Sequence, residues 1–98
     1  MKVNINGAGL LKDKYAYLIQ KKLDKLETFY GRIVHANVHL KEEGEAVKNK
    51  QVEMTLFVPG PDMFAIAEAD SFEKAIAAAS EKLRTQLVRF KDQLVERR

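Results

Sequence analysis

Apolar and polar residues alternate with two different periods along this chain of 98 residues. Val3 and Ile5 alternate with polar neighbours as far as Gly7, which predicts a short strand. The apolar residues then recur every three or four positions, which is the spacing of an amphipathic helix that ends near Gly31. The stripe of this helix consists of Leu11, Tyr15, Ile19, Leu23, Leu26 and Tyr30, widened by Leu18 and Phe29.

Three further strands are expected in the middle of the chain. The stretch "RIVHANVHLK" alternates apolar residues with histidines, and its predicted buried face is Val34, Ala36, Val38 and Leu40. A second alternation of period two runs from Val52 to Val58, and the turn "VPGPD" separates it from "MFAIAEA". We interpret that last stretch as a strand whose alanines pack closely beneath a helix, and Pro61 before it suits a sheet edge.

The last third of the chain carries the strongest helical pattern. Ser71 is a candidate N-cap, and apolar residues follow it in steps of three or four: Phe72, Ile76, Ala79, Leu83, Leu87, Phe90 and Leu94. At ~1.5 Å per residue, about 25 helical residues span roughly 38 Å, whereas a strand of about eight residues spans about 26 Å. Some two turns should therefore extend beyond the sheet, and they carry Arg89, Lys91, Arg97 and Arg98.

The element order is thus β-α-β-β-β-α, an α+β fold with a four-stranded mixed sheet. A right-handed crossover places the first helix over one face of the sheet, and the last helix must return over the same apolar face. Both helices follow strands that run in the same direction, so we expect them to be roughly parallel. The other face of the sheet, which is polar, should contact water.

The composition changes this picture only slightly. The length suits one domain, 46% of the residues are hydrophobic and 32% are charged, and the net charge is +3. The absence of cysteine favours a reducing cytoplasm. No apolar stretch is long enough to predict a membrane helix.

Catalytic and metal sites find little support in the sequence. His35 and His39 share a strand face, but four residues of strand separate them by about 13 Å, too far for one zinc ion. The cluster of Glu42, Glu43 and Glu45 lies in a charged loop, which favours solvated carboxylates over acid–base chemistry. We therefore expect no enzyme activity, no metal, no cofactor and no small-molecule substrate.

The charges of the first helix are segregated by sign. Lys14, Lys21, Lys22 and Lys25 fall on one flank of the apolar stripe, and Asp13, Gln20, Asp24 and Glu27 fall on the other. On the last helix, Lys82 and Arg89 lie on one side of the stripe, and Arg84 and Lys91 lie on the other. Two helices on one sheet face can therefore form a broad positive surface suited to the phosphates of folded RNA. The alternative is that these are ordinary solvated lysines.

Aromatic stacking contributes less to the RNA hypothesis. Most aromatic residues lie on or beside the apolar stripes, and Tyr17, Phe57 and Phe64 are the ones expected to be free to stack on a base.

Three strings of this sequence together resemble one family: "KKLDKLETFYGRI", "VPGPDMFA" and "DSFEKAIAAASEKLRTQLVRFKDQL". They are similar to those of the ribosome hibernation promoting factors, also called ribosome-associated inhibitors or subunit-interface proteins. The resemblance implies the same β-α-β-β-β-α fold. It also implies binding to the small ribosomal subunit in the channel of messenger and transfer RNAs, with inhibition of translation under starvation or stress.

The resemblance also implies which residues contact ribosomal RNA. The matching positions are Lys22, Lys25, Lys82, Arg89 and Lys91, and the flank argument adds Lys21 and Arg84. We expect one ribosome-binding domain, residues 1–98, without the C-terminal domain through which longer relatives join two ribosomes. The alternative function is a regulatory module that binds a protein through its open sheet face or an edge strand.

Overall fold

The structure is a computed structural model that describes residues 1–45 and 47–96, with side chains as far as residue 94. Its elements are β1 (Lys2–Gly7), α1 (Leu11–Phe29), β2 (His35–Glu42), β3 (Lys50–Phe57), β4 (Met63–Ala69) and α2 (Phe72–Glu96). The predicted element order is confirmed. Arg97 and Arg98, which the helix length predicts beyond the sheet, lie outside the described residues.

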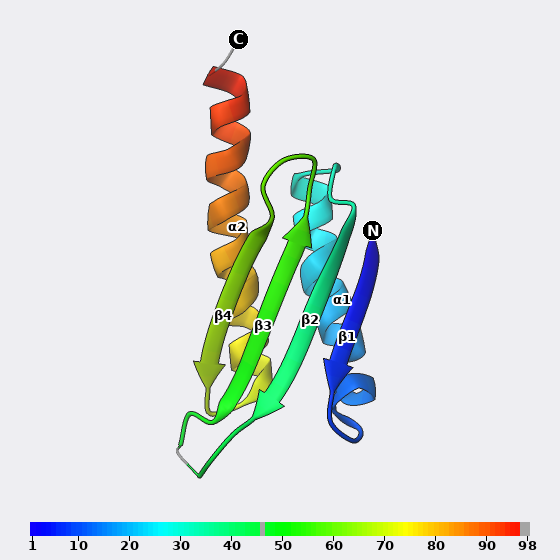
Figure 1. Cartoon of the computed structure of the whole chain (residues 1–98), viewed down its shortest axis with the longest axis vertical. Coiled ribbons are helices and arrows are strands. Elements are labelled where there is room, and N and C mark those ends of the chain that lie inside the picture. The colour runs from blue at the N-terminus through cyan, green and yellow to red at the C-terminus, as the bar shows by residue number, and fades with distance from the viewer. Residues whose placement is uncertain (46, 97–98) are drawn as a thin grey trace.

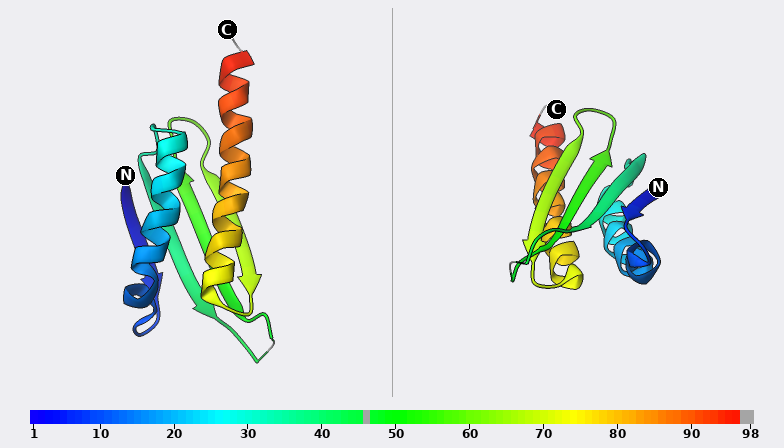
Figure 2. Two further views of the ribbon diagram at one scale, coloured as in Figure 1. Left: turned by 180° about the vertical axis from the view of Figure 1, so that it is seen from behind. Right: turned by 60° about the horizontal axis from the view of Figure 1, so that its bottom comes forward.

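The four strands form one mixed sheet in the order β1-β2-β3-β4. β1 pairs with β2 in parallel, and β2–β3 and β3–β4 are antiparallel. Both helices lie on one face of this sheet and run in the same direction, as predicted (Figures 1 and 2). This arrangement places two helical surfaces side by side.

The core lies between the sheet and the helices. The largest fully buried side chains come from α1, the central strands and α2: Ile19, Leu23, Val38, Val52, Met54, Leu56, Ile76, Leu83 and Leu87. On β4, Ala65 and Ala67 are buried beneath α2, which confirms the interpretation of the small residues in that strand. Since each helix buries one stripe, its rotation about its own axis is set, and so is the direction of its charged flanks.

One predicted core position is wrong. The alternation places Val34 on the buried face of the second strand, but its side chain is 60% exposed. The strand begins only at His35, and the core position before it is taken by Ile33. Because Val34 precedes the regular pleat, the two-residue alternation does not apply to it.

α2 extends past the sheet, as its length predicts (Figure 1). Phe90 is the last side chain of α2 packed against the core, where its ring meets that of Tyr30 edge to face at 5.8 Å. Beyond it, Leu94 continues the apolar stripe but is 39% exposed. Among the described side chains of α2, those that follow Phe90 therefore no longer pack against the hydrophobic core.

Candidate nucleic-acid interface

The two flanks of α1 face different neighbours. On the acidic flank, the Glu27 carboxylate forms an ion pair of 2.6 Å with the amino group of Met1, next to β1. Asp24, one turn earlier, accepts a hydrogen bond from Gln20. On the other flank, Lys22 and Lys25 turn toward α2. Two lysines of α1, Lys22 and Lys25, are therefore directed to the space between the helices.

α2 also has two different flanks. Arg84 lies on the side that faces α1, where it lines the same groove as Lys22 and Lys25. Lys82 lies on the opposite side, above β4, where its ammonium donates a hydrogen bond of 2.6 Å to the carbonyl oxygen of Ile66. Arg89 is exposed and follows Lys82 by two turns, so it occupies the same outer flank.

The groove between the helices has a volume of about 430 Å³. Its lining is Lys22, Lys25 and Leu26 from α1 and Ala77, Ser80, Glu81 and Arg84 from α2. Small residues form part of the α2 wall, and the hydroxyl of Ser80 donates to the carbonyl oxygen of Ala77 at 2.9 Å. Three cations and one carboxylate thus line an open groove whose net charge is positive.

Two cations of α2 meet the C-terminal end of α1 at Phe29. The Arg84 guanidinium lies 5.3 Å from the centroid of the Phe29 ring, and the Lys91 ammonium lies 4.6 Å from it. The same ammonium donates a hydrogen bond of 3.1 Å to the carbonyl oxygen of Phe29. The negative end of the α1 dipole therefore faces positive charge.

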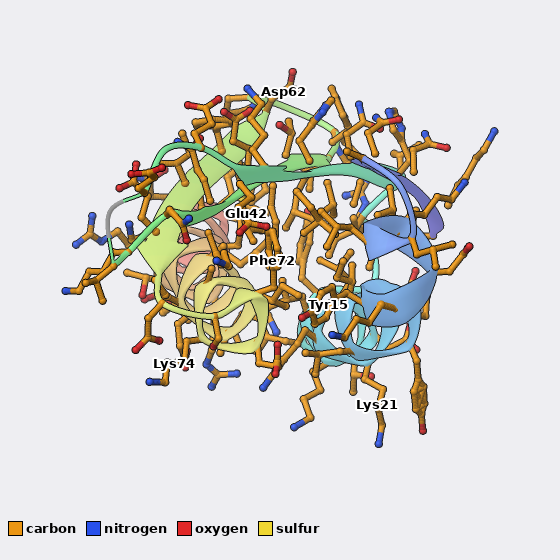
Figure 3. All side chains as sticks on the ribbon, turned by 90° about the horizontal axis from the view of Figure 1, so that it is seen from below. Tyr15, Lys21, Glu42, Asp62, Phe72 and Lys74 are labelled. Carbon is orange, nitrogen blue, oxygen red and sulfur yellow. The ribbon has the colours of Figure 1, made fainter. Side chains whose placement is uncertain are left out.

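An aromatic contact joins the two helices near their N-terminal ends. Tyr15 and Phe72 meet between the helices with their ring centroids 5.3 Å apart (Figure 3). Burial raises the pKa of the Tyr15 hydroxyl, and a hydrogen bond and charge interaction with Glu73 raise it further.

The seven predicted cations do not form one cluster. Lys22, Lys25 and Arg84 line the groove, and Lys91 shares the Phe29 ring with Arg84. Lys21 points away from the sheet (Figure 3), with its ammonium 5.1 Å from the Tyr17 ring centroid. Lys82 and Arg89 occupy the outer flank of α2.

None of the seven forms an ion pair within the part of the chain that the structure describes. The pairs present there join Met1 to Glu27, Lys41 to Glu53, Lys50 to Glu42 and Lys74 to Asp70. The side chains of the seven are exposed, apart from half-buried Lys22. Their charges are therefore free of ion-pair partners among the described residues.

The three aromatic residues expected to be free to stack on a base differ in their exposure to water. Tyr17 and Phe64 are 65% and 52% exposed. Phe57 is only half exposed to water, because His35 stacks on its ring with a centroid separation of 4.0 Å. None of these three lines the groove, so the groove offers charge and shape but no aromatic platform.

The structure adds two observations on other kinds of site. Within the described residues, no three His, Cys, Asp or Glu side chains are arranged to hold a metal ion. Neither helix, over the same residues, has an apolar stretch that could cross a bilayer.

Sequence reasoning missed Phe29 as part of this surface. Its helical spacing identifies it as a residue that widens the apolar stripe, and it does pack against the core. The additional interactions come from α2, and Lys91 is 62 residues away along the chain. No local pattern could have paired these residues.

The fold defines a class of small α+β domain in which two parallel helices cover one face of a four-stranded mixed sheet, with a groove between the helices. Residues 3–95 match the model of the family described as sigma 54 modulation protein / S30EA ribosomal protein, and the chain belongs to this family.

Named relatives cover nearly the whole chain. The ribosome hibernation promoting factor of Azotobacter vinelandii is 34% identical over 98 residues, which are 99% of this chain and 89% of that protein. The protein of the same name from Pseudomonas putida is 31% identical over 93 residues, 94% of this chain and 88% of its own length.

Solved structures agree with the fold. A ribosomal subunit interface protein from Coxiella burnetii has a TM-score of 0.80 at 26% identity, covering 94% of this chain and 99% of its own. The N-terminal domain of Protein Y from Thermus thermophilus also has a TM-score of 0.80, at 27% identity over 92% of this chain and 99% of its own.

Proposed function

We propose that this protein is a cytoplasmic ribosome hibernation factor. It binds the small ribosomal subunit through ribosomal RNA and inhibits translation by occupying the channel of messenger and transfer RNAs. It acts by occupancy and not by catalysis. Membership of the family and the names of the relatives support the ribosome as the partner.

The observation that best supports an RNA interface is that Lys22 and Lys25 of α1 line the same groove as Arg84 of α2. These side chains belong to two helices whose packing is set by the core, so their spacing does not depend on a loop. Cations without an ion-pair partner among the described residues suit RNA phosphates, because binding releases the counterions condensed on the RNA.

The geometry favours recognition of the RNA backbone. The groove has no exposed aromatic side chain on which an unpaired base could stack. Cations that project from two helices packed on one core instead fit the regular phosphate rows of a folded or double-helical segment. We therefore propose that the helical surface reads the shape of the ribosomal RNA and not its base sequence.

The alternative, a protein partner on the sheet, is weakened by two observations. At the β4 edge, the carbonyl oxygens of Phe64 and Ile66 already accept hydrogen bonds from Gln86 and Lys82 of α2, with which an added strand would have to compete. Phe57 is partly covered by His35. Phe64 and Ile66 remain exposed on the open face, and this patch is what still favours a protein partner.

The test is co-sedimentation of purified small subunits with three variants that each reverse two charges. The groove variant is Lys25→Glu with Arg84→Glu, the outer-flank variant is Lys82→Glu with Arg89→Glu, and the control is Lys2→Glu with Lys48→Glu. We expect the groove variant to lose binding and the control to retain it, with circular dichroism spectra unchanged. Retained binding by the groove variant would reject the interface.

Two further arms test the partner and the channel. Nuclease treatment of the captured complex should release the protein if RNA is the partner, whereas a protein partner would survive it. Pre-bound messenger and transfer RNA should reduce binding of the parent protein. Binding that is indifferent to both RNAs would place the protein elsewhere on the subunit.

A further inference from the structure

Phe29 of α1 makes three contacts with cations of α2, whereas the last turn of α1 itself has no basic residue. The Lys91 ammonium lies 4.6 Å from its ring centroid, and the Arg84 guanidinium lies 5.3 Å from it. The Lys91 ammonium also donates to the Phe29 carbonyl oxygen at 3.1 Å. One residue thus engages two of the predicted RNA-contacting cations through both its ring and its backbone.

The backbone interaction has a clear electrostatic origin. Phe29 is the last residue of α1, so its carbonyl is among the last four, which have no partner within the helix. α1 has no basic residue in its own last turn. Lys91 therefore supplies from α2 the positive charge that a helix C-terminus attracts.

The ring restricts side chains that would otherwise be mobile. Arginine and lysine have many rotamers, and a phosphate that binds a freely rotating side chain must first order it. A cation held against the face of an aromatic ring has fewer accessible positions. The Phe29 ring is half-buried and packed against the core, so it is a fixed support.

We infer that Phe29 is a positioning residue for RNA binding: its ring and carbonyl hold Arg84 and Lys91 in place at the end of the inter-helix groove. This inference rests on the proposed function, because it assumes that the helical surface binds ribosomal RNA. Phe29 itself need not touch the RNA. A leucine could fill the same apolar position but offers no aromatic face, so that substitution separates packing from the positioning of the cations.

The test compares Phe29→Leu with Phe29→Tyr in equilibrium binding to purified small subunits. Removal of one exposed cation–π interaction corresponds to about a two- to fivefold change in an equilibrium constant. We expect Phe29→Leu to weaken binding about fivefold and Phe29→Tyr to bind like the parent. In a background of Arg84→Gln with Lys91→Gln, Phe29→Leu should have no further effect.

Three results would overturn the inference. The first is that Phe29→Leu binds small subunits with the affinity of the parent. The second is that Phe29→Leu weakens binding equally in the background of Arg84→Gln with Lys91→Gln, because the effect would then come from packing alone. The third needs no variant: in the NMR spectrum of the parent protein, the side-chain protons of Arg84 and Lys91 must show ring-current shifts, and random-coil values would exclude the interaction. If the groove variant binds small subunits as tightly as the parent, the proposed function itself fails. If the groove variant loses binding but Phe29→Leu binds like the parent, only the positioning role fails.

Discussion

The ammonium of Lys82 on α2 donates a hydrogen bond of 2.6 Å to the carbonyl oxygen of Ile66 in β4. One turn later, the Gln86 side chain donates to the carbonyl oxygen of Phe64 at 2.7 Å. β4 is an outer strand of the sheet, and exposed strand edges invite pairing with another chain. Two side chains of α2 thus cover the edge beside which they pack.

The first prediction concerns this edge. Substituting both residues, Lys82→Ala with Gln86→Ala, should lower the free energy of unfolding by about 1–2 kcal/mol, because each exposed hydrogen bond contributes about 1 kcal/mol or less. The freed carbonyls should also promote self-association that increases with protein concentration. Urea denaturation and sedimentation velocity measure the two effects. Gln93→Ala, an exposed neutral substitution further along α2, is the control and should change neither.

A second prediction concerns the start of α2. The Ser71 hydroxyl accepts a hydrogen bond of 3.2 Å from the backbone N–H of Lys74, which confirms it as the N-cap. Ser71→Ala should destabilise the protein by about 1 kcal/mol, and Ser71→Asp should restore most of that stability. Thermal unfolding should show the destabilisation as a shift of about 4–8 °C. An unchanged midpoint in Ser71→Ala would contradict the cap.

A third prediction follows from the charge of Asp70. The hydrogen bond and the positive charge of Lys74, 3.0 Å away, lower the pKa of the Asp70 carboxyl below its ordinary value of 3.8. The unfolded chain therefore binds this proton more tightly than the folded chain does. The stabilisation is present above the unfolded pKa and is lost as the pH falls through the lower, folded pKa.

Asp70→Asn should accordingly unfold at a lower temperature than the parent at neutral pH, and the difference should vanish in strong acid. Thermal melts across the acidic range measure this convergence. Asp62→Asn, at another exposed carboxylate, controls for a general change in net charge. A difference that persisted in strong acid would mean that packing, and not ionisation, causes the destabilisation.

Most of the fold could be predicted because its periodic patterns are long and regular. The stripe from Phe72 to Leu87 is buried throughout, and the alternation from Val52 to Val58 corresponds to the observed face of β3 and the residue after it. The pattern misplaces Val34, since alternation marks a face but not the residue at which a strand begins.

The candidate site could be predicted only in part. Helical spacing correctly places Lys82 and Arg84 on opposite sides of the apolar stripe of α2, because both lie on one helix with known geometry. Which of them faces α1 depends on the order of the strands beneath the helices, and the alternation within one strand does not contain this information. The hydrogen bond between Lys91 and Phe29 depends in addition on the relative placement of the helices, so it emerges only in three dimensions.

The last prediction addresses the physical basis of binding. If Lys25 and Arg84 bind phosphates, affinity for small subunits should fall linearly with salt on a double-logarithmic plot, because each neutralised phosphate releases condensed counterions. The slope is negative, and its magnitude should decrease by about 0.7–0.9 for each phosphate that a variant no longer neutralises. Lys25→Gln with Arg84→Gln should therefore make the slope shallower by about 1.5. The control, Lys2→Gln with Lys48→Gln, removes the same charge outside the groove and should leave the slope nearly unchanged. Equal slopes for the two double variants would show that net charge, and not the groove between the helices, determines how this protein binds RNA.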